Sequence, residues 1–413
     1  MKYTPKTKEE LRELISNLDI NLGDIDTSLI TDMSGLFAVK YKFFADDGAS
    51  DSEPRVIRTD FSGIENWDTS YVENMSEMFE NNPCFNEPIG KWDVSNVVDM
   101  GGMFNGAKCF NQPLDKWNVG KVKDMHSMFS RAQSFNQPLG SWNVGNVTDM
   151  SEMFSDCYLF NQPLNDWDVS QVEHMRVMFS NARSFNQPLG SWNVSKVTDM
   201  RCMFYKCYLF NQPLNDWDVS HVTDMGSMFN EAYSFNQPLD KWNVGQVSVM
   251  VGMFENAGHF NQPLNAWNVS KVEIMSSMFW GAVSFNQPLN NWDVSSVRDM
   301  SHMFYDAVLF NQPLNDWDVS KVEDMSSMFC GTVSFNQPLN DWDVSRVMNM
   351  GCMFDFATSF NQSLESWNVS SVTDMSCMFE GSGMEDTPPS WFNNESNDEE
   401  WDESEDEDDE EDN

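Results

Sequence analysis

Residues 310–342, FNQPLNDWDVSKVEDMSSMFCGTVSFNQPLNDW, decide the fold, because the eight residues that begin this stretch return 25 positions later to end it. The same period places thirteen tryptophans at intervals of 25, from Trp67 to Trp367, without one insertion or deletion. A fixed period is typical of solenoids, in which each unit contacts chiefly its neighbours. The period therefore predicts one elongated domain, although a length of 413 residues alone would suggest about two or three globular ones.

Each unit, called a coil here, is numbered from its tryptophan as repeat position 1 and follows W-[DN]-V-[SG]-x-V-x-x-M-x-x-M-F-x-x-A-x-x-F-N-Q-P-L-x-x. About nine of these positions are apolar, which is more than a 25-residue unit buries alone, so stacked coils must share one continuous core. Asn at position 20, from Asn86 to Asn361, is expected to form a ladder that satisfies backbone groups from coil to coil.

Two segments of the coil carry local structural signals. Positions 7–16 place an acid after Thr or Ser and then Met, Met and Phe at helical spacing, as in residues 198–207, and this predicts a short helix. Positions 23–3, Leu-x-x-Trp-x-Val, alternate as in a short strand, and Pro at position 22 marks its start. We expect one short parallel strand and one short helix per coil, with neighbouring strands about 4.7–4.9 Å apart.

Four regions are expected along the chain. They are an N-terminal capping helix within 1–24, a degenerate first repeat with an inserted loop at 25–66, thirteen coils at 67–383 and a disordered acidic tail at 384–413. The capping helix is expected over about 6–18, and it would cover the open apolar end of the solenoid. Ile25 replaces the tryptophan of the first repeat and lies 17 residues further from Trp67 than one period allows. The tail is expected to be disordered because its blocks of Asp and Glu repel one another.

The net charge of −41 excludes two classes of partner. Nucleic-acid binding needs clustered Lys and Arg, and anionic membrane surfaces attract basic segments. No apolar run approaches the roughly 20 residues of a membrane span, so no membrane insertion is expected. The N-terminus leads into a charged helical stretch rather than an apolar signal core, which favours a cytoplasmic location.

The pattern F-N-Q-P-L-x-x-W-[DN]-V-S-x-V-x-D-M-x-x-M-F-x-x-A, over about residues 25–383, resembles the BspA-like leucine-rich-repeat surface proteins, in their branch with 25-residue units. Leu-x-x-Trp-x-Val stands where ordinary leucine-rich repeats carry Leu-x-x-Leu-x-Leu. The resemblance implies a curved, leucine-rich-repeat-like solenoid used for adhesion or protein recognition, often at a microbial cell surface, and it brings no catalytic residues. It therefore favours a cell-surface or secreted location, against the cytoplasmic one indicated by the N-terminus.

The histidines and cysteines do not form a recognisable catalytic or metal site. The five histidines occupy five different repeat positions, so the period brings no two together: His126, His174, His221, His259 and His302. The eight cysteines show no zinc spacing, and free thiols are expected. Two pairs share a column in adjacent coils and could be bridged, namely Cys84 with Cys109 and Cys352 with Cys377. Because an active site needs unlike groups converging at one place, we do not expect an enzyme.

Position 2, directly after the tryptophan, is always Asp or Asn and is expected to point outward from the strand. The candidate binding residues are three consecutive position-2 carboxylates and two acids on the same face: Asp293, Asp318, Asp343, Asp316 and Asp341. Like charges stacked about 5 Å apart would be relieved by a cation, with Ca²⁺ favoured by an all-oxygen ligand set, or by a basic partner. The alternative is that position 2 caps a local turn through an Asx hydrogen bond, since Asn serves there as well. No other cofactor is expected.

We therefore expect a non-catalytic protein-binding or adhesive scaffold that recognises a protein partner through its sheet face and variable positions. The alternative is an acidic protein that binds a cation or a basic partner through the Asp column and the tail. The sequence identifies neither the partner nor the oligomeric state.

The predicted solenoid has a consequence in solution. Small-angle scattering of the purified chain is expected to show an elongated particle, because stacked coils extend along one axis. A profile that fits a compact sphere would exclude the solenoid.

Overall fold

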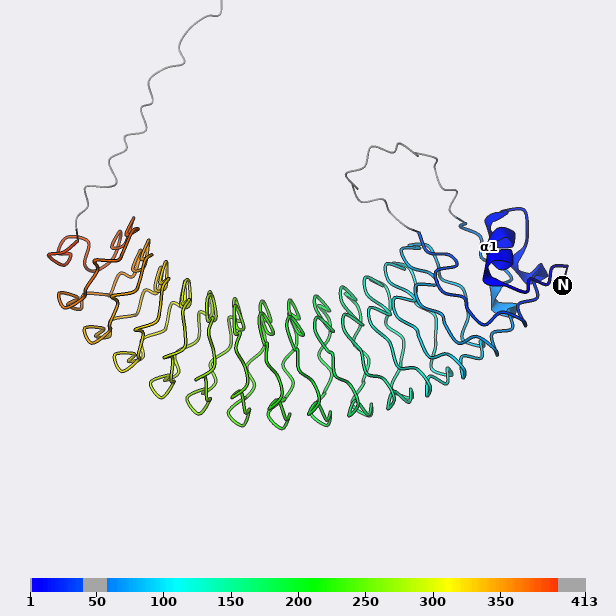
Figure 1. Cartoon of the computed structure of the whole chain (residues 1–413), viewed down its shortest axis with the longest axis horizontal. Helices are drawn as coiled ribbons and strands as arrows, with labels where there is room; N and C mark the ends of the chain where they lie inside the picture. Colours follow the sequence, from blue (N-terminus) through cyan, green and yellow to red (C-terminus); the bar gives the residue numbers. More distant parts are fainter. Residues whose placement is uncertain (1, 40–57, 393–413) are drawn as a thin grey trace, which may run out of the picture.

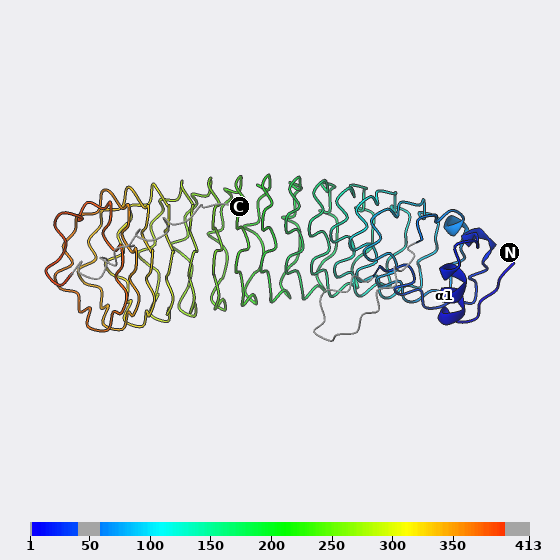
Figure 2. The ribbon, with the colours of Figure 1, turned by 90° about the horizontal axis from the view of Figure 1, so that it is seen from above.

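The computed structural model describes residues 2–39 and 58–392. These residues form coils stacked along an arc, with the N-terminal helix α1 at one end and the last coil at the other (Figure 1). Seen from above, the coils stand side by side in one row (Figure 2). The solenoid predicted from the tryptophan period is confirmed. Within the described ranges, no helix has both the length and the apolar character needed to cross a membrane.

The N-terminal end is covered by helix α1, Lys8–Ser16, and two short 3-10 helices, η1 at Leu22–Asp24 and η2 at Ile64–Asn66. The α1 helix lies inside the predicted range 6–18 and begins after Thr7, whose hydroxyl accepts the N–H of Glu10 at 3.2 Å. Its apolar side, with Leu11 and Ile15, is buried against the first coils. The expected cap is therefore present.

The chain after α1 is held by one buried arginine. The Arg58 guanidinium donates to the carbonyls of Ile15, Asn17 and Ile20 at 3.1, 2.7 and 3.1 Å. These carbonyls lie at and beyond the helix C-terminus, where carbonyl groups lack intrahelical donors and attract a cation. Arg58 thus joins the segment before the regular coils to the cap.

Aromatic columns fill the core along its whole length. The repeat tryptophans are only 3–4% exposed, and each indole N–H donates to a leucine or isoleucine carbonyl one coil back, as Trp317 does to Leu289 at 3.1 Å. Phe329 and Phe335, at positions 13 and 19, stack within their coil with ring centroids 4.2 Å apart. The aromatic rings stack on one another, and the indole N–H groups donate to carbonyl oxygens of the protein. The buried indole N–H groups therefore have hydrogen-bond partners without water.

Neighbouring coils are joined by a backbone ladder over positions 7–15. In one pair of coils Met325, Ser327 and Phe329 donate their N–H groups to carbonyls of the next coil at 3.0, 2.8 and 2.9 Å. A single parallel bridge per coil forms at position 8, from Asp32–Asn74 to Asn349–Asp374. The ladder therefore consists of isolated bridges rather than extended strands.

The predicted helix over positions 7–16 and the predicted strand over positions 23–3 are both wrong for the described coils. Positions 11 and 15 have positive φ, for example 53° at Ser327 and 65° at Gly331, and they interrupt any helix. The N–H groups of positions 9, 11 and 13 also donate to the next coil instead of to their own. In positions 23–3 the N–H of Trp317 closes a turn onto Leu314 at 3.0 Å, so this segment is not extended.

The opposite side of each coil is bridged by side chains. The Asn311 Oδ1 accepts the N–H of Asn336 at 3.0 Å and the side-chain amide of Gln337 at 2.9 Å, and the same contacts recur along the column. The predicted Asn ladder at position 20 is thus confirmed. A side chain is inserted here because the backbones of adjacent coils lie too far apart for direct hydrogen bonds.

The difference in spacing explains the arc. Hydrogen-bonded backbones are about 4.7–4.9 Å apart. By contrast, the ring centroids of Phe304 and Phe329 are 5.7 Å apart, and those of the stacked Trp342 and Trp367 are 6.3 Å apart. The ladder must therefore lie on the concave side of the arc in Figure 1, and the tryptophans on the convex side. The predicted spacing of 4.7–4.9 Å between tryptophan-bearing segments is wrong. We call the outward side chains of positions 7, 8, 10, 11, 14 and 15 the inner face.

The solenoid extends past the predicted boundary at 383. Trp391 stacks on Trp367 with centroids 6.4 Å apart, and its indole N–H donates to Leu364 at 2.9 Å. Phe392 packs edge-on against Phe379 at 5.0 Å. Residues 384–392 therefore cap the last coil. The remainder of the predicted disordered tail, 393–413, and residues 40–57 of the predicted loop region lie outside the described residues.

Removing one rung of the Asn ladder should destabilise the solenoid. The Asn236 Oδ1 accepts the N–H of Asn261 at 3.0 Å and the amide of Gln262 at 2.9 Å. The half-buried Asn261 N–H loses its acceptor, whereas the Gln262 amide keeps the Asn236 backbone carbonyl at 3.2 Å. Asn236→Ala is therefore expected to lower the free energy of unfolding by about 1–3 kcal/mol and to speed amide exchange at Asn261. The control Asn236→Asp keeps an acceptor oxygen, so equal losses in the two variants would contradict the ladder's role.

Candidate interaction face

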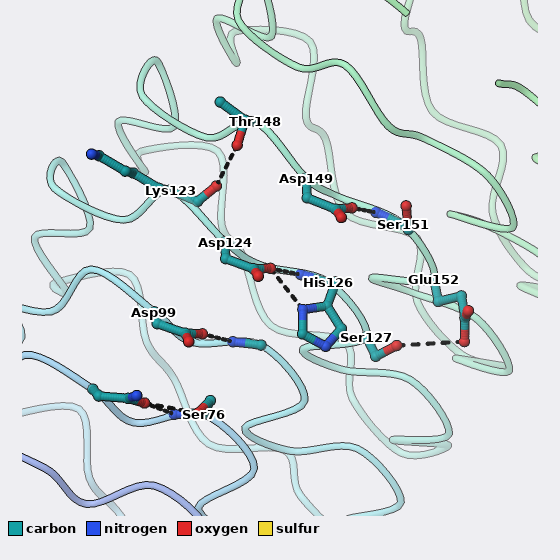
Figure 3. Close-up of polar contacts among 12 residues, drawn as sticks. Ser76, Asp99, Lys123, Asp124, His126, Ser127, Thr148, Asp149, Ser151 and Glu152 are labelled. Atoms are coloured by element: carbon teal, nitrogen blue, oxygen red, sulfur yellow. Dashed lines mark hydrogen bonds and ion pairs between the residues drawn. The ribbon is translucent and has the colours of Figure 1, made fainter. Parts of the chain in front are cut away.

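A column of carboxylates runs along the inner face at position 8. It comprises Asp99, Asp124, Asp149, Asp199, Asp224, Asp299, Asp324 and Asp374. Each accepts the backbone N–H of position 10 at 2.8–3.0 Å, as Asp149 does from Ser151 (Figure 3). These Asx hydrogen bonds orient the carboxylates along the ladder, where neighbouring coils are closest. The inner face is therefore lined with negative charge, which is half-buried at every one of these residues except the exposed Asp374.

Burial and neighbouring charges shift the pKa values of carboxyl groups in this column. Burial raises the pKa of Asp99, and the neighbouring Asp124 carboxylate raises it further, while burial is also the main cause of the raised pKa of Asp224. Two position-10 side chains pair with carboxylates of the column. Arg201 lies 2.9 Å from Asp199 and 3.4 Å from Asp224, and the His126 Nδ1 lies 2.7 Å from the Asp124 Oδ1 (Figure 3).

Aromatic side chains occupy positions 14 and 17 in the middle coils. Arg183 lies over the ring of Tyr158 at 4.5 Å and that of Tyr208 at 5.8 Å, and Tyr208 stacks on Tyr233 at 5.2 Å. These position-17 residues form a continuous row at the edge of the inner face. The cation–ring contacts fix the row in place.

A second aromatic cluster lies on the inner face itself. Trp280, at position 14, has its ring centroid 4.7 Å from Tyr305 and 5.2 Å from His302. Of the sixteen tryptophans, thirteen are the repeat residues, Trp391 caps the last coil and Trp401 lies outside the described residues. Trp280 is thus a tryptophan that the repeat does not require, and it is half-buried.

The residues predicted as a binding site lie elsewhere. Asp293, Asp318 and Asp343 are exposed on the convex, tryptophan side, and each accepts the N–H of the serine two residues later at 3.1 Å. The side chain of the same serine, followed by its backbone N–H, holds the pKa of Asp318 and Asp343 below the usual value. The Asx hydrogen bond of the turn-capping alternative is therefore present at all three residues. The spacing of about 5 Å expected for this column belongs instead to the ladder, since tryptophans next to it are 6.3–6.5 Å apart where they stack.

The two acids predicted to join this site are also exposed. Asp341 accepts the amides of Asn315 and Asn340 at 2.5 and 2.7 Å, and Asp316 lies at the same position one coil earlier. Within residues 2–39 and 58–392, no group of three or more His, Cys, Asp or Glu side chains is arranged to hold a metal ion. All eight cysteines are free, so neither candidate disulfide is formed.

The inner-face residues were missed by the sequence prediction because the strand was placed at the wrong repeat positions. Asp-x-Ser occurs at position 2 and again at position 8, with the same local hydrogen bond at both. Only the location of the ladder distinguishes the two columns. His126 and His302, which the period brings together with no other histidine, lie beside Asp124 and in the aromatic cluster of Trp280.

Comparisons with known proteins identify a family and no function. A family model described as "Mycoplasma protein of unknown function, DUF285" matches residues 55–158, 137–233, 210–316 and 287–391. No curated protein matches the chain. A chain in the crystal structure of a TLR13–ssRNA13 complex is matched with 11% identity and a TM-score of 0.19, over 72% of this chain and 52% of the other. The present chain thus spans about half of that one, and so low a TM-score supports no conclusion about fold or ligand.

The His126–Asp124 pair should be visible in a pH titration. The hydrogen bond to Asp124 raises the pKa of His126 above the usual 6.5, burial opposes this, and Asp149 and Asp99 raise it further. Because the folded pKa exceeds the unfolded one, the pair stabilises the fold fully below about pH 6.5 and loses this effect as the pH rises through the folded pKa. In Asp124→Asn the imidazole midpoint, measured by NMR, is expected to fall.

The matched control for this titration is Asp374→Asn, which changes a position-8 carboxylate far along the solenoid and should leave His126 unchanged. An identical His126 midpoint in the wild type and in Asp124→Asn would show that the hydrogen bond does not set the pKa.

Proposed function

The chain belongs to the family described as Mycoplasma protein of unknown function, DUF285, and we propose that it is a non-catalytic protein-binding scaffold that recognises its partner through the inner face. The observation that carries this proposal is the division of each coil into a constant core and a variable inner face. Positions 1, 9 and 13 are Trp, Met and Phe in all thirteen coils, whereas position 14 ranges over Ser, Asn, Tyr, Trp, Cys, Asp and Glu.

A concave face with varied side chains on a constant scaffold suits protein recognition. Solenoids offer extended concave surfaces of this kind, and interface energy is concentrated in residues such as Trp, Tyr and Arg. Tyr205, Trp280 and Tyr305 stand among the position-14 residues, and Arg176 and Arg201 among those of position 10. The inner face therefore combines aromatic contacts with charge.

We place recognition on the inner face rather than on the position-2 acids. Asp293, Asp318 and Asp343 already serve their own turns through the serine N–H groups, and they lie on the convex side. A catalytic role is not part of the proposal, because the recurring features form columns and do not converge on one place.

Adhesion is the finer form of the proposal. It draws on the resemblance of the repeat to the BspA-like leucine-rich-repeat surface proteins, and it applies if the chain reaches the cell surface. An intracellular scaffold would use the same face. Localising the chain in its native cell decides between these two settings.

Site-specific photo-crosslinking tests the proposed function. The photoreactive residue p-benzoyl-phenylalanine replaces the exposed Thr223 at position 7 of the inner face, or the exposed Asp318 on the convex side as the matched control. In an extract from the native cell, the Thr223 variant is expected to form one discrete protein adduct that is absent from the Asp318 variant. Adducts from neither position, or from Asp318 alone, would contradict recognition through the inner face.

A further inference from the structure

We infer that the middle of the inner face binds an extended peptide segment of a protein partner that carries a Lys or Arg side chain, and that this cation lies against Trp280 and Tyr305. The residues concerned, called the central patch, are Val249, Val251, Ile274, Trp280, His302 and Tyr305. The inference rests on the proposed function, and it specifies the partner's chemistry.

The central patch interrupts the acidic column. Position 8 is Asp, Asn or His in eleven coils, but it is Val249 and Ile274 in the coils that begin at Trp242 and Trp267. These two residues pair across the ladder, and Val251 replaces the usual polar or small residue at position 10. All three apolar side chains are half-buried on the concave side. A partner that covers them gains roughly 25 cal/mol for each Å² of apolar surface removed from water.

The aromatic part of the patch lacks a cation that similar rings of this chain possess. Elsewhere Arg183 lies over two tyrosine rings, and the Lys206 Nζ lies 4.8 Å from the ring centroid of Tyr205. Across the described ranges, no such cation lies over Trp280 or Tyr305. Arg298, at position 7 of the same coil as Tyr305, pairs with Glu323 at 3.5 Å. The parts of these two half-buried rings that His302 does not cover can therefore accept a partner's cation.

Acids on both sides of the aromatic pair favour a positive partner. Along the position-14 column, Glu255 precedes Trp280 by one coil and Asp355 follows Tyr305 by two. Burial raises the pKa of both carboxyl groups, and it also raises the pKa of Asp306 beside Tyr305. A partly desolvated carboxylate is stabilised by a nearby cation.

Unpartnered oxygens flank the patch in the same column. The buried Asp355 Oδ1, two coils after Tyr305, has no hydrogen-bond donor among the described residues, and neither has the buried Oδ1 of Asn230, two coils before Trp280, whose amide donates to Glu255 at 2.9 Å. Guanidinium and ammonium groups carry donors only, so they match the aromatic faces of the patch and the carboxylates that flank it. The net charge of −41 adds a long-range attraction for such a partner.

The size of the patch matches a short extended segment. Its residues come from three successive coils, whose ladder spacing of about 4.8 Å gives a length of roughly 10 Å along the solenoid. An extended peptide advances about 3.3 Å per residue, so roughly three residues lie over the patch. A segment with a basic residue flanked by apolar ones therefore fits the patch, because the basic residue matches the aromatic rings and the apolar residues match the valine and isoleucine side chains.

Calorimetric titration of the full chain with a defined peptide tests the inference. The probe is acetyl-Gly-Leu-Arg-Leu-Gly-amide, and its control has citrulline, a neutral analogue of the same shape, in place of arginine. The arginine peptide is expected to bind saturably and more tightly than the citrulline peptide. Trp280→Ala is expected to weaken arginine-peptide binding by roughly 2- to 30-fold, the range of a cation–ring contact.

Two further variants make the result specific. Trp280→Phe keeps an aromatic face and should recover part of the affinity, while Tyr233→Ala removes an exposed ring outside the patch and should bind like the wild type. Equal binding of the two peptides, an unchanged affinity in Trp280→Ala, or no saturable binding would overturn the inference. A Thr223 adduct obtained without peptide binding overturns this inference alone, whereas peptide binding without an inner-face adduct contradicts the proposed function.

Discussion

The structure depends on hydrogen bonds that no coil can make by itself. In positions 7–15 the N–H groups of Met325, Ser327 and Phe329 find their acceptors in the following coil. A buried N–H without an acceptor costs free energy comparable to a lost hydrogen bond, so an isolated coil is unstable. Every coil is stable only between two others, and the two ends need the α1 cap and the Trp391 segment.

Curvature follows from the same bonds. The ladder holds the coils close on one side, while stacked indoles and the inserted Asn side chains keep them further apart on the other. The outward side chains of the ladder are therefore gathered on a concave surface, where the carboxylates of position 8 are crowded. Burial there, and after it the neighbouring Asp124 carboxylate, raises the pKa of Asp99. Arg201 and His126 pair with carboxylates of the same column.

The molecule separates stability from recognition within each 25-residue coil. The indole, thioether and phenyl groups point inward and are nearly invariant, so the scaffold does not change when an outward residue does. The inner face is free to vary, and it changes from acidic to apolar and aromatic around Trp280. The coils around Trp280 therefore differ from the rest of the solenoid in the residues of their inner face, although their core residues are the same.

The sequence by itself determined the period, the core positions, the Asn ladder and the capping helix, because these follow from residue type and spacing alone. It did not determine the secondary structure of the coil, since Met, Met and Phe at i, i+3 and i+4 fit successive turns as well as a helix. It also could not separate Asp318 from Asp324, because both accept a serine N–H two residues later. Only the tertiary structure placed Asp324 on the concave face and Asp318 on the convex one, because only the pairing of neighbouring coils decides which side of the coil is drawn together.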